Sequence, residues 1–196
     1  MAKRELPSPE VLRQLLRYEP ETGKLFWKER GPEWFEGGKI CSCRGWNTRF
    51  AMTEAFTALT AGYRSGAVLG VPVYAHRVAW AIVFGAWPVG DIDHFNHDKT
   101  DNRLCNLSDV SASDNMKNQS LRIDNLSGQT GVSWSGQRGM WCVKVKASGR
   151  SYHGGFFMNI DEAIDAAVSA HNSLGFHPNH GRRAGEFSGR PPVTVA

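Results

Sequence analysis

An acidic residue and a histidine stand side by side at Asp93 and His94, and two carboxamides follow at Asn106 and Asn115. Imidazole titrates near neutral pH and suits a general base. A carboxylate and a carboxamide offer oxygen ligands to a hard divalent ion, which keeps its other positions for water and phosphate. These residues can therefore build a one-metal site that hydrolyses a phosphodiester bond, with His94 activating the water.

The stretch that carries these residues predicts two short strands followed by a helix. Residues 92–95 and 106–110 are typical of strands, and residues 96–102 form a polar loop between them. Successive strand residues point to opposite faces, so Asp93 and His94 can face one ion only where the strand runs into the loop. Ser111 then begins a helix, with Asp114 placed for a capping box.

The carboxamides have separate expected roles. Asn106 lies at the far side of the loop, where its amide can bond the backbone and hold the loop that presents His94. Asn115 and Asn118 are three residues apart on the expected helix and share a face, so either can be the second metal ligand.

The charge distribution favours a polyanionic partner. The 196-residue chain has a net charge of +4 and a pI of about 9.0. No acidic residue occurs between Asp124 and Asp161, whereas the metal-site stretch is rich in aspartate. A basic module beside an acidic one suits a protein that grips phosphate with one part and holds a cation with the other.

The cysteines and the hydropathy pattern indicate the cellular compartment. Cys41, Cys43 and Cys105 leave a structural zinc site as an alternative, but CxC without a second pair favours reduced thiols. The first residues lack the apolar core of a signal peptide, and no apolar run approaches membrane-spanning length. We expect a cytoplasmic protein with no membrane partner and no small-molecule cofactor, acting as a monomer or homodimer.

The flanking regions predict further elements. Ser8 and Pro9 begin a helix with an apolar face, residues 24–27 form a strand, residues 67–75 form a hairpin, and residues 76–84 form a helix. Residues 31–62 are rich in aromatic side chains, show no clear period and are left unassigned; a basic and aromatic mix there can contact DNA.

In residues 140–147, Trp141, Val143 and Val145 alternate with Cys142, Lys144 and Lys146, which predicts a half-buried strand. A second strand over 150–157 and a helix beginning at Asn159 follow.

Residues 75–118 resemble the HNH endonucleases, the ββα-metal nucleases. The words HRVAW, GAWPVG, IDH, DKTDNRLCNL and SASDN occur in family order, closest to the phage and intron-encoded branch whose last metal ligand is Asn. The N-terminal LLRYEPETGKLFWKER is similar to the leader of phage HNH proteins. The resemblance implies Asp93 and Asn115 as ligands of Mg²⁺ or Mn²⁺, with Asn118 as the competing ligand, His94 as general base and Asn106 as the structural Asn. His97 stands where the family usually has a small Gly.

Residues 127–176 resemble the plant ethylene-response-factor (Apetala-type) DNA-binding domain, through SGQTGVSW, WCVKVKASGRSYHGGFF and DEAIDAAVSAHNSLG. That resemblance implies a three-stranded sheet backed by one helix, with the open face of the sheet in the DNA major groove and Trp141 packed inward. The residues that it directs towards double-stranded DNA are Trp134, Arg138, Lys144, Lys146, Arg150 and His153.

Together these features predict an α+β chain with a ββα-metal core and a three-stranded antiparallel sheet packed on one helix. The expected parts are an N-terminal α/β region (1–74), the nuclease core (75–119), a linker (120–128), the DNA-binding domain (129–180) and a basic tail (181–196). The expected function is site-specific, homing-type DNA cleavage to a 5′-phosphate and a 3′-hydroxyl. The alternatives are a DNA-binding regulator with an inactive nuclease core and a nuclease with little sequence preference.

Overall fold

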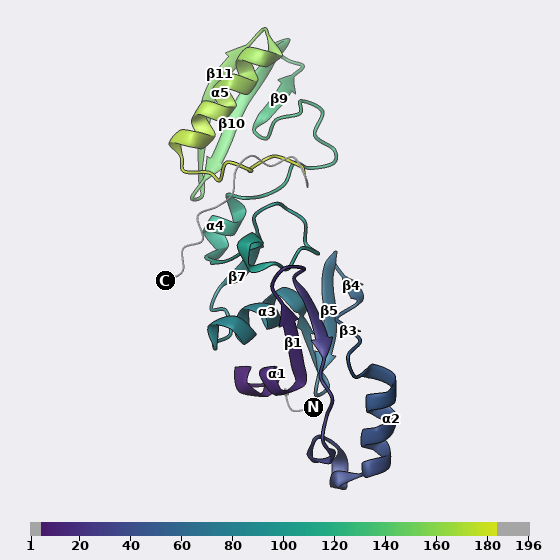
Figure 1. Cartoon of the computed structure of the whole chain (residues 1–196). Helices are drawn as coiled ribbons and strands as arrows, with labels where there is room; N and C mark the ends of the chain where they lie inside the picture. The colour runs from purple at the N-terminus through teal and green to yellow at the C-terminus, as the bar shows by residue number, and fades with distance from the viewer. Residues whose placement is uncertain (1–4, 184–196) are drawn as a thin grey trace. The chain divides into compact units, whose positions relative to one another are not determined.

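The computed structural model describes residues 5–183, apart from the side chains of residues 112 and 113. The chain divides into two compact units. The first runs to His94 and includes Lys99–Asp109, and the second contains Phe95–Asp98 and the described residues from Val110 onward. Both units combine helices with small sheets, which confirms the predicted α+β class (Figure 1). The predicted basic tail falls, from residue 184 on, outside the described residues.

The first unit is built from short elements, which follow one another along the chain as α1 (Pro9–Leu15), β1 (Leu16–Glu19), β2 (Lys24–Trp27), η1 (Pro32–Trp34), η2 (Glu36–Gly38), α2 (Ile40–Phe50), β3 (Glu54–Ala55), β4 (Ala58–Thr60), β5 (Tyr63–Val68), β6 (Val71–Tyr74), α3 (Ala75–Phe84), β7 (Asp91–His94), η3 (Leu104–Asn106) and β8 (Leu107–Val110). Three strands pair in the order β1-β2-β3, three in the order β4-β5-β6, and β7 pairs with β8. No helix in residues 5–183 has the length and apolar character needed to cross a membrane.

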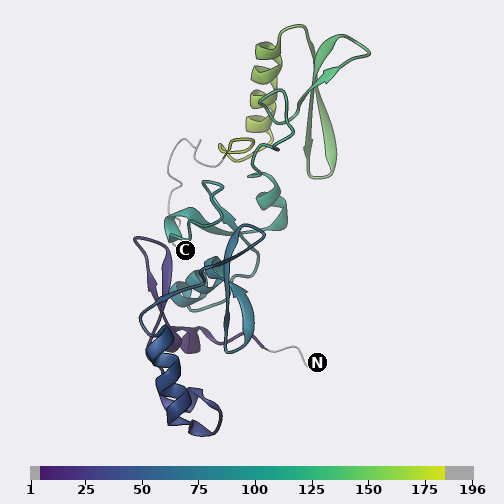
Figure 2. The same cartoon turned by 90° about the vertical axis from the view of Figure 1, so that its right-hand side faces the viewer.

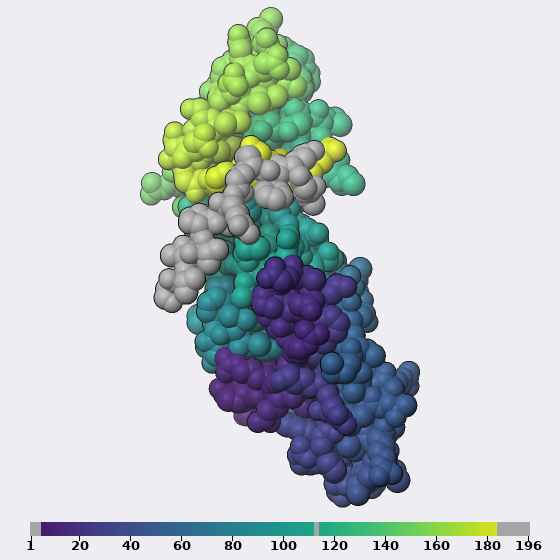
Figure 3. All heavy atoms as spheres, viewed as in Figure 1, coloured from purple at the N-terminus to yellow at the C-terminus, as the bar shows by residue number. Residues whose placement is uncertain are grey.

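Helix α1 forms as its sequence predicts. The Ser8 hydroxyl accepts a hydrogen bond from the Val11 amide at 3.3 Å, and Pro9 occupies the first turn, where its missing N–H costs nothing. The apolar face of α1 enters a core shared with α3 and the β-strands. The buried residues of that core are Leu12, Leu15, Leu16, Leu25, Ala55, Phe56, Val68, Ala75, Val78 and Ala81. Figure 3 shows the N-terminal segment, in purple, at the surface of this unit.

The predicted hairpin and helix that precede the Asp93–His94 pair are both present. Strands β5 and β6 pair antiparallel, and Val68 lies opposite Val71 across the turn. Helix α3 begins directly after β6 and ends at Gly85, which takes the left-handed conformation that favours glycine.

Residues 31–62, which the pattern left unassigned, contain α2. Most of its side chains are exposed, and its sequence ICSCRGWNTRF lacks a continuous apolar face. Contacts with Arg30 hold it instead. Asn47 accepts from the Arg30 amide at 3.0 Å and donates to the Arg30 carbonyl at 2.9 Å, and the Arg30 guanidinium lies 3.9 Å from the centre of the Trp46 ring. Tertiary contact therefore compensates for weak local propensity.

The second unit contains α4 (Ala112–Met116), β9 (Val132–Ser135), β10 (Met140–Ala147), β11 (Arg150–Phe157) and α5 (Ile160–Ser173). The three strands form an antiparallel sheet in the order β11-β10-β9, and α5 lies along one face of it (Figures 1 and 2). Val132, Val143, Ala163 and Ala167 form the buried core between sheet and helix. The predicted sheet packed on one helix is thus confirmed.

The predicted alternation along β10 is also confirmed. Val143 and Val145 are buried, whereas Lys144 and Lys146 are exposed. At the start of α5, Asn159 caps the helix as predicted, by accepting from the Asp161 amide at 2.8 Å. This bond is of the local Asx type.

Leu12→Ala tests the core of the first unit. Leu12 is 0% exposed, so we expect the free energy of unfolding to fall by about 2–5 kcal/mol. Leu59→Ala, at a side chain that is 61% exposed, should change it by less than about 0.5 kcal/mol. Urea unfolding followed by tryptophan fluorescence measures both, and equal effects would contradict this core.

Candidate functional site

The turn before β7 is held from two sides. Arg77, on α3, donates to the carbonyls of Pro88 and Gly90, each at 3.0 Å. The Asp109 carboxylate, on β8, accepts from the amides of Val89 and Gly90 at 2.9 and 2.8 Å. These four bonds fix the point at which the chain enters the strand that carries Asp93 and His94.

Strand β7 alternates in burial. Ile92 and His94 are 6% and 4% exposed, Asp91 is exposed, and Asp93 is half-buried. His94 is therefore almost fully buried in the first unit, and Asp93, beside it, is half-buried.

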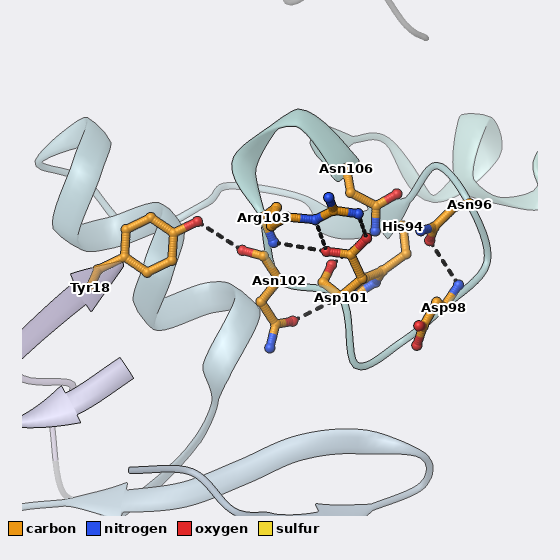
Figure 4. Close-up of polar contacts among 8 residues, drawn as sticks. All are labelled: Tyr18, His94, Asn96, Asp98, Asp101, Asn102, Arg103 and Asn106. Atoms are coloured by element: carbon orange, nitrogen blue, oxygen red, sulfur yellow. Dashed lines mark hydrogen bonds and ion pairs between the residues drawn. The ribbon is translucent and has the colours of Figure 1, made fainter. Parts of the chain in front are cut away.

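The His94 imidazole meets a carboxamide that the sequence analysis did not single out. His94 Nε2 lies 3.3 Å from Asn102 Oδ1, to which it donates in the Nε2–H tautomer (Figure 4). The basic lone pair is then on Nδ1. Asn102 is 3% exposed, and its carbonyl accepts from the Tyr18 hydroxyl at 2.9 Å. Burial raises the pKa of Tyr18 to about 12, so this hydroxyl stays protonated and donates at physiological pH.

The loop that carries Asn102 is held at two further points. Asn106 Nδ2 donates to the Asp101 carbonyl at 2.8 Å, which is the backbone bond predicted for Asn106 (Figure 4). The β1–β2 hairpin approaches from the other side. A Cβ atom on Gly23, where φ is +73°, would lie 2.5 Å from the Arg103 nitrogen and 2.6 Å from the Asn102 carbonyl carbon. Only glycine permits this contact between the hairpin and the loop.

Aromatic rings surround His94 on its buried side. The His76 ring, from the first turn of α3, lies perpendicular to it at 5.1 Å between centroids, and the Tyr63 ring lies at 5.7 Å. Burial, and then the neighbouring His94, lower the pKa of His76 to about 3. His76 is therefore neutral at physiological pH and adds no positive charge beside His94.

The remaining metal-ligand candidates belong to the second unit. Ser111 caps α4, as predicted, by accepting from the Asp114 amide at 3.2 Å, and its hydroxyl donates to the Asp114 carboxylate at 2.7 Å. Asn115 is half-buried on this helix. Asn118 is 4% exposed, and its Oδ1 lies 2.9 Å from Nε2 of His97. His97 has φ of +60°, the left-handed region that favours glycine and explains why a small residue suits this position.

The sheet face opposite α5 carries most of the residues predicted to contact DNA. Lys144 pairs with His153 across the strands, and Lys146 lies two residues further along the same face. Arg138, in the β9–β10 turn, stacks on Phe156 at 4.4 Å. Ser133 and Ser135, on β9, complete this face through their pairing with Cys142 and Met140. We call this surface, Arg138, Lys144, Lys146 and His153 with their neighbours, the open face.

Two of the predicted residues lie elsewhere on the sheet. Trp134 pairs with Trp141, and their rings meet edge to face at 5.2 Å, on the side that also carries Val132. Arg150 pairs with Ala147 at the end of the β10–β11 hairpin, where it is exposed. The strand period therefore separates these two side chains from the open face.

The donor set suits a hard cation. Within residues 5–183, no group of three His, Cys, Asp or Glu side chains can hold a metal ion. A site of one carboxylate and one carboxamide is a different kind, because Mg²⁺ commonly takes one or two protein oxygens and keeps its waters. The Asp93 carboxylate and the Asn115 carboxamide are each an oxygen donor of that kind. Of the cysteines, Cys41 is exposed, and the Cys43 thiol donates to the Arg30 carbonyl at 3.0 Å.

Three residues around His94 were not predicted from the sequence: Tyr18, His76 and Asn102. Tyr18 and Asn102 are 84 positions apart, so no local pattern connects them. His76 and Asn102 both lie in words quoted for the family resemblance, which was the one available signal.

Buried His76 makes the first unit sensitive to acid. Its folded pKa is far below its ordinary value, so the unfolded chain takes up a proton below about pH 6.5 while the folded chain does not until about pH 3. We expect stability to be unaffected by His76 above pH 6.5 and to fall between these limits, by at most about 1.4 kcal/mol per pH unit. His76→Phe should flatten this dependence in urea titrations at several pH values. An unchanged slope would contradict the assignment.

Residues 73–117 match the family model described as HNH endonuclease. No curated protein and no solved structure gives a significant match to the chain. The matched segment contains α3, β7, β8 and α4, and with them Asp93, His94, Asn106 and Asn115. This segment is therefore similar to the HNH endonucleases, and the activity that the similarity supports is that of a nuclease acting on DNA.

Proposed function

We propose that this protein is a divalent-metal-dependent, site-specific DNA endonuclease of the homing type. The observation that carries the proposal is the HNH match over residues 73–117, which includes an Asp93–His94 strand whose histidine is held by a fixed loop. Hydrolysis would yield a 5′-phosphate and a 3′-hydroxyl.

His94 is the proposed general base. It takes a proton from the water that attacks phosphorus, and the bond to the 3′ oxygen breaks. The Asn102 carboxamide orients the imidazole, and Tyr18 and Asn106 hold the segment that presents Asn102. All three act through His94 and are positioning residues in this scheme. His76, neutral beside His94, adds no positive charge next to the base.

Asp93 and Asn115 are the proposed ligands of Mg²⁺ or Mn²⁺. When bound, such an ion polarises the scissile phosphate and stabilises charge on the leaving 3′ oxygen. Asn115 is preferred over Asn118 because Asn118 is almost fully buried and its Oδ1 already faces the His97 imidazole. In this scheme Asn118 is not a ligand and instead contacts the His97 ring.

The open face is the proposed DNA-binding surface. The exposed cations Lys144, Lys146 and Arg138 gather on the side of the sheet that α5 leaves uncovered, in a stretch of sequence without acidic residues. Such a surface neutralises phosphate and places flat groups such as His153 near base edges. Arg150, at the hairpin end, is proposed to contact the DNA backbone beside this face. Trp134, on the edge strand β9, is proposed to contact DNA only at the edge of the sheet.

The N-terminal region is a second proposed DNA contact. Arg44 and Arg49 are exposed on α2, whereas Arg30 is occupied by the Trp27 and Trp46 rings. We therefore assign phosphate contact to the exposed arginines and a structural role to Arg30.

A DNA-binding regulator with an inactive core, and a nuclease with little sequence preference, are the competing functions. Incubation of a plasmid library with Mg²⁺ or Mn²⁺ separates the three. A defined break supports the proposal. Binding without nicking in either ion favours the regulator, and random smearing favours the unspecific nuclease.

His94→Ala tests the base. We expect cleavage to fall by about 10²–10⁴-fold, while DNA affinity in the absence of divalent ions is unchanged. Single-turnover cleavage and fluorescence anisotropy measure the two quantities on the same duplex. Equal loss of both would show that His94 supports the fold and not the chemistry.

Lys144→Ala and Lys146→Ala test the open face. Each should weaken binding uniformly across sequences and reduce the slope of log affinity against log salt by about 1. Lys24→Ala is the matched control, because Glu54 already pairs with that ammonium at 2.9 Å. Slopes identical to wild type in both open-face variants would remove this surface from the proposal.

A further inference from the structure

The segment that follows α5 lies beside the residues that follow α4. We call residues 176–182 the C-terminal strap. Three backbone hydrogen bonds join it to residues 117–121: His177 N to Lys117 O at 3.1 Å, Gly181 N to Gln119 O at 2.8 Å, and Leu121 N to Arg182 O at 3.2 Å. The strap therefore lies along the segment that leaves α4, within the second unit.

The strap also reaches the loop that begins at Phe95. Asn179 is 1% exposed, and its Nδ2 donates to the Phe95 carbonyl at 2.9 Å. The His177 ring meets the Phe95 ring edge to face, with 4.6 Å between centroids. Phe95 directly follows His94, so these contacts constrain the residue next to the proposed base.

His97, in the same loop, contacts both the C-terminal strap and the segment that leaves α4. Its Nδ1 lies 3.0 Å from the Arg182 carbonyl, and its Nε2 lies 2.9 Å from Asn118 Oδ1. The Arg182 carbonyl oxygen only accepts, so Nδ1 donates to it, and the direction of the Nε2 contact with Asn118 depends on the protonation of the ring. The left-handed backbone at His97 is strained for a residue with a side chain, and the two ring contacts offset that strain.

We propose that the C-terminal strap is a positioning element of the nuclease site, with Asn179 and His97 as its positioning residues. This inference rests on the proposed function, because the loop it holds continues from Asp93 and His94 and the segment it pairs with continues from the helix of Asn115. The strap also continues from α5 of the DNA-binding unit. The contacts of the strap then order the Phe95–Asp98 loop for cleavage.

Asn179→Ala in the full chain is the first test. We expect the cleavage rate at saturating DNA to fall by about 10²-fold with unchanged DNA affinity, since small misplacements of reacting groups have effects of that size. Hydrogen exchange at the Phe95–Asp98 amides should rise by at least about tenfold. Asn172→Ala, at an exposed position of α5, is the matched control and should match wild type in both measurements.

Gly181→Ala perturbs the strap without deleting a functional group, and Gly175→Ala is its control. A Cβ on Gly181 would lie 2.5 Å from Thr130 Oγ1, whereas a Cβ on Gly175 meets nothing within 4 Å. Both glycines have positive φ, +75° and +69°, so the backbone strain is matched. Gly181→Ala should slow cleavage and raise exchange at Phe95–Asp98, and Gly175→Ala should do neither.

His97→Gly separates backbone strain from clamping. Glycine relieves the left-handed strain but loses both ring contacts, so cleavage should still fall. Cleavage equal to wild type in His97→Gly and Asn179→Ala, with unchanged exchange, would overturn the proposal. If the wild type cuts no DNA, the proposed function fails by itself. The exchange data still decide the inference: faster exchange in Asn179→Ala supports the strap, and unchanged exchange refutes it.

Discussion

The contact between the His94 imidazole and the Asn102 carboxamide links the proposed base to the loop that supports it. Asn102 lies in a polar loop that has no regular backbone pairing of its own and would lose order readily in isolation. Three contacts hold it: the Tyr18 hydroxyl and the close approach of Gly23, both from the β1–β2 hairpin, and the Asn106 amide. A buried histidine with a fixed hydrogen-bond partner has a defined orientation, which is what a general base requires. The N-terminal hairpin is therefore part of the support of the site.

In the second unit, one face of the sheet packs on α5 and the other carries exposed basic side chains. Helix α5 brings Ala163 and Ala167 against Val132 and Val143, and these small residues allow helix and sheet to approach closely. The bulge between Val143 and Lys144 re-registers β11 so that His153, and not Gly154, faces Lys144. The cations consequently gather on the uncovered side, where they remain solvated and available to phosphate.

Two residues near the proposed site are in unusual environments. His76 is buried without charge beside His94, and His97 takes a backbone conformation that is strained for a side chain of its size. Each is tolerable because its surroundings compensate: aromatic rings pack around the first, and hydrogen bonds at both ring nitrogens hold the second. Such departures from local preference cluster where a protein positions reacting groups.

The amino-acid sequence alone was enough to predict the elements that have strong local signals. Ser8 and Ser111 mark the starts of α1 and α4, the alternation through Val143 and Lys144 marks a half-buried strand, and the family words around Asp93 and His94 lead to the nuclease. The folded chain was needed to show that α2 is a helix, that Tyr18 reaches Asn102, and that Trp134 faces away from the lysines. The physical reason is range: caps and alternation act over a few residues, whereas these contacts join side chains that only folding brings together.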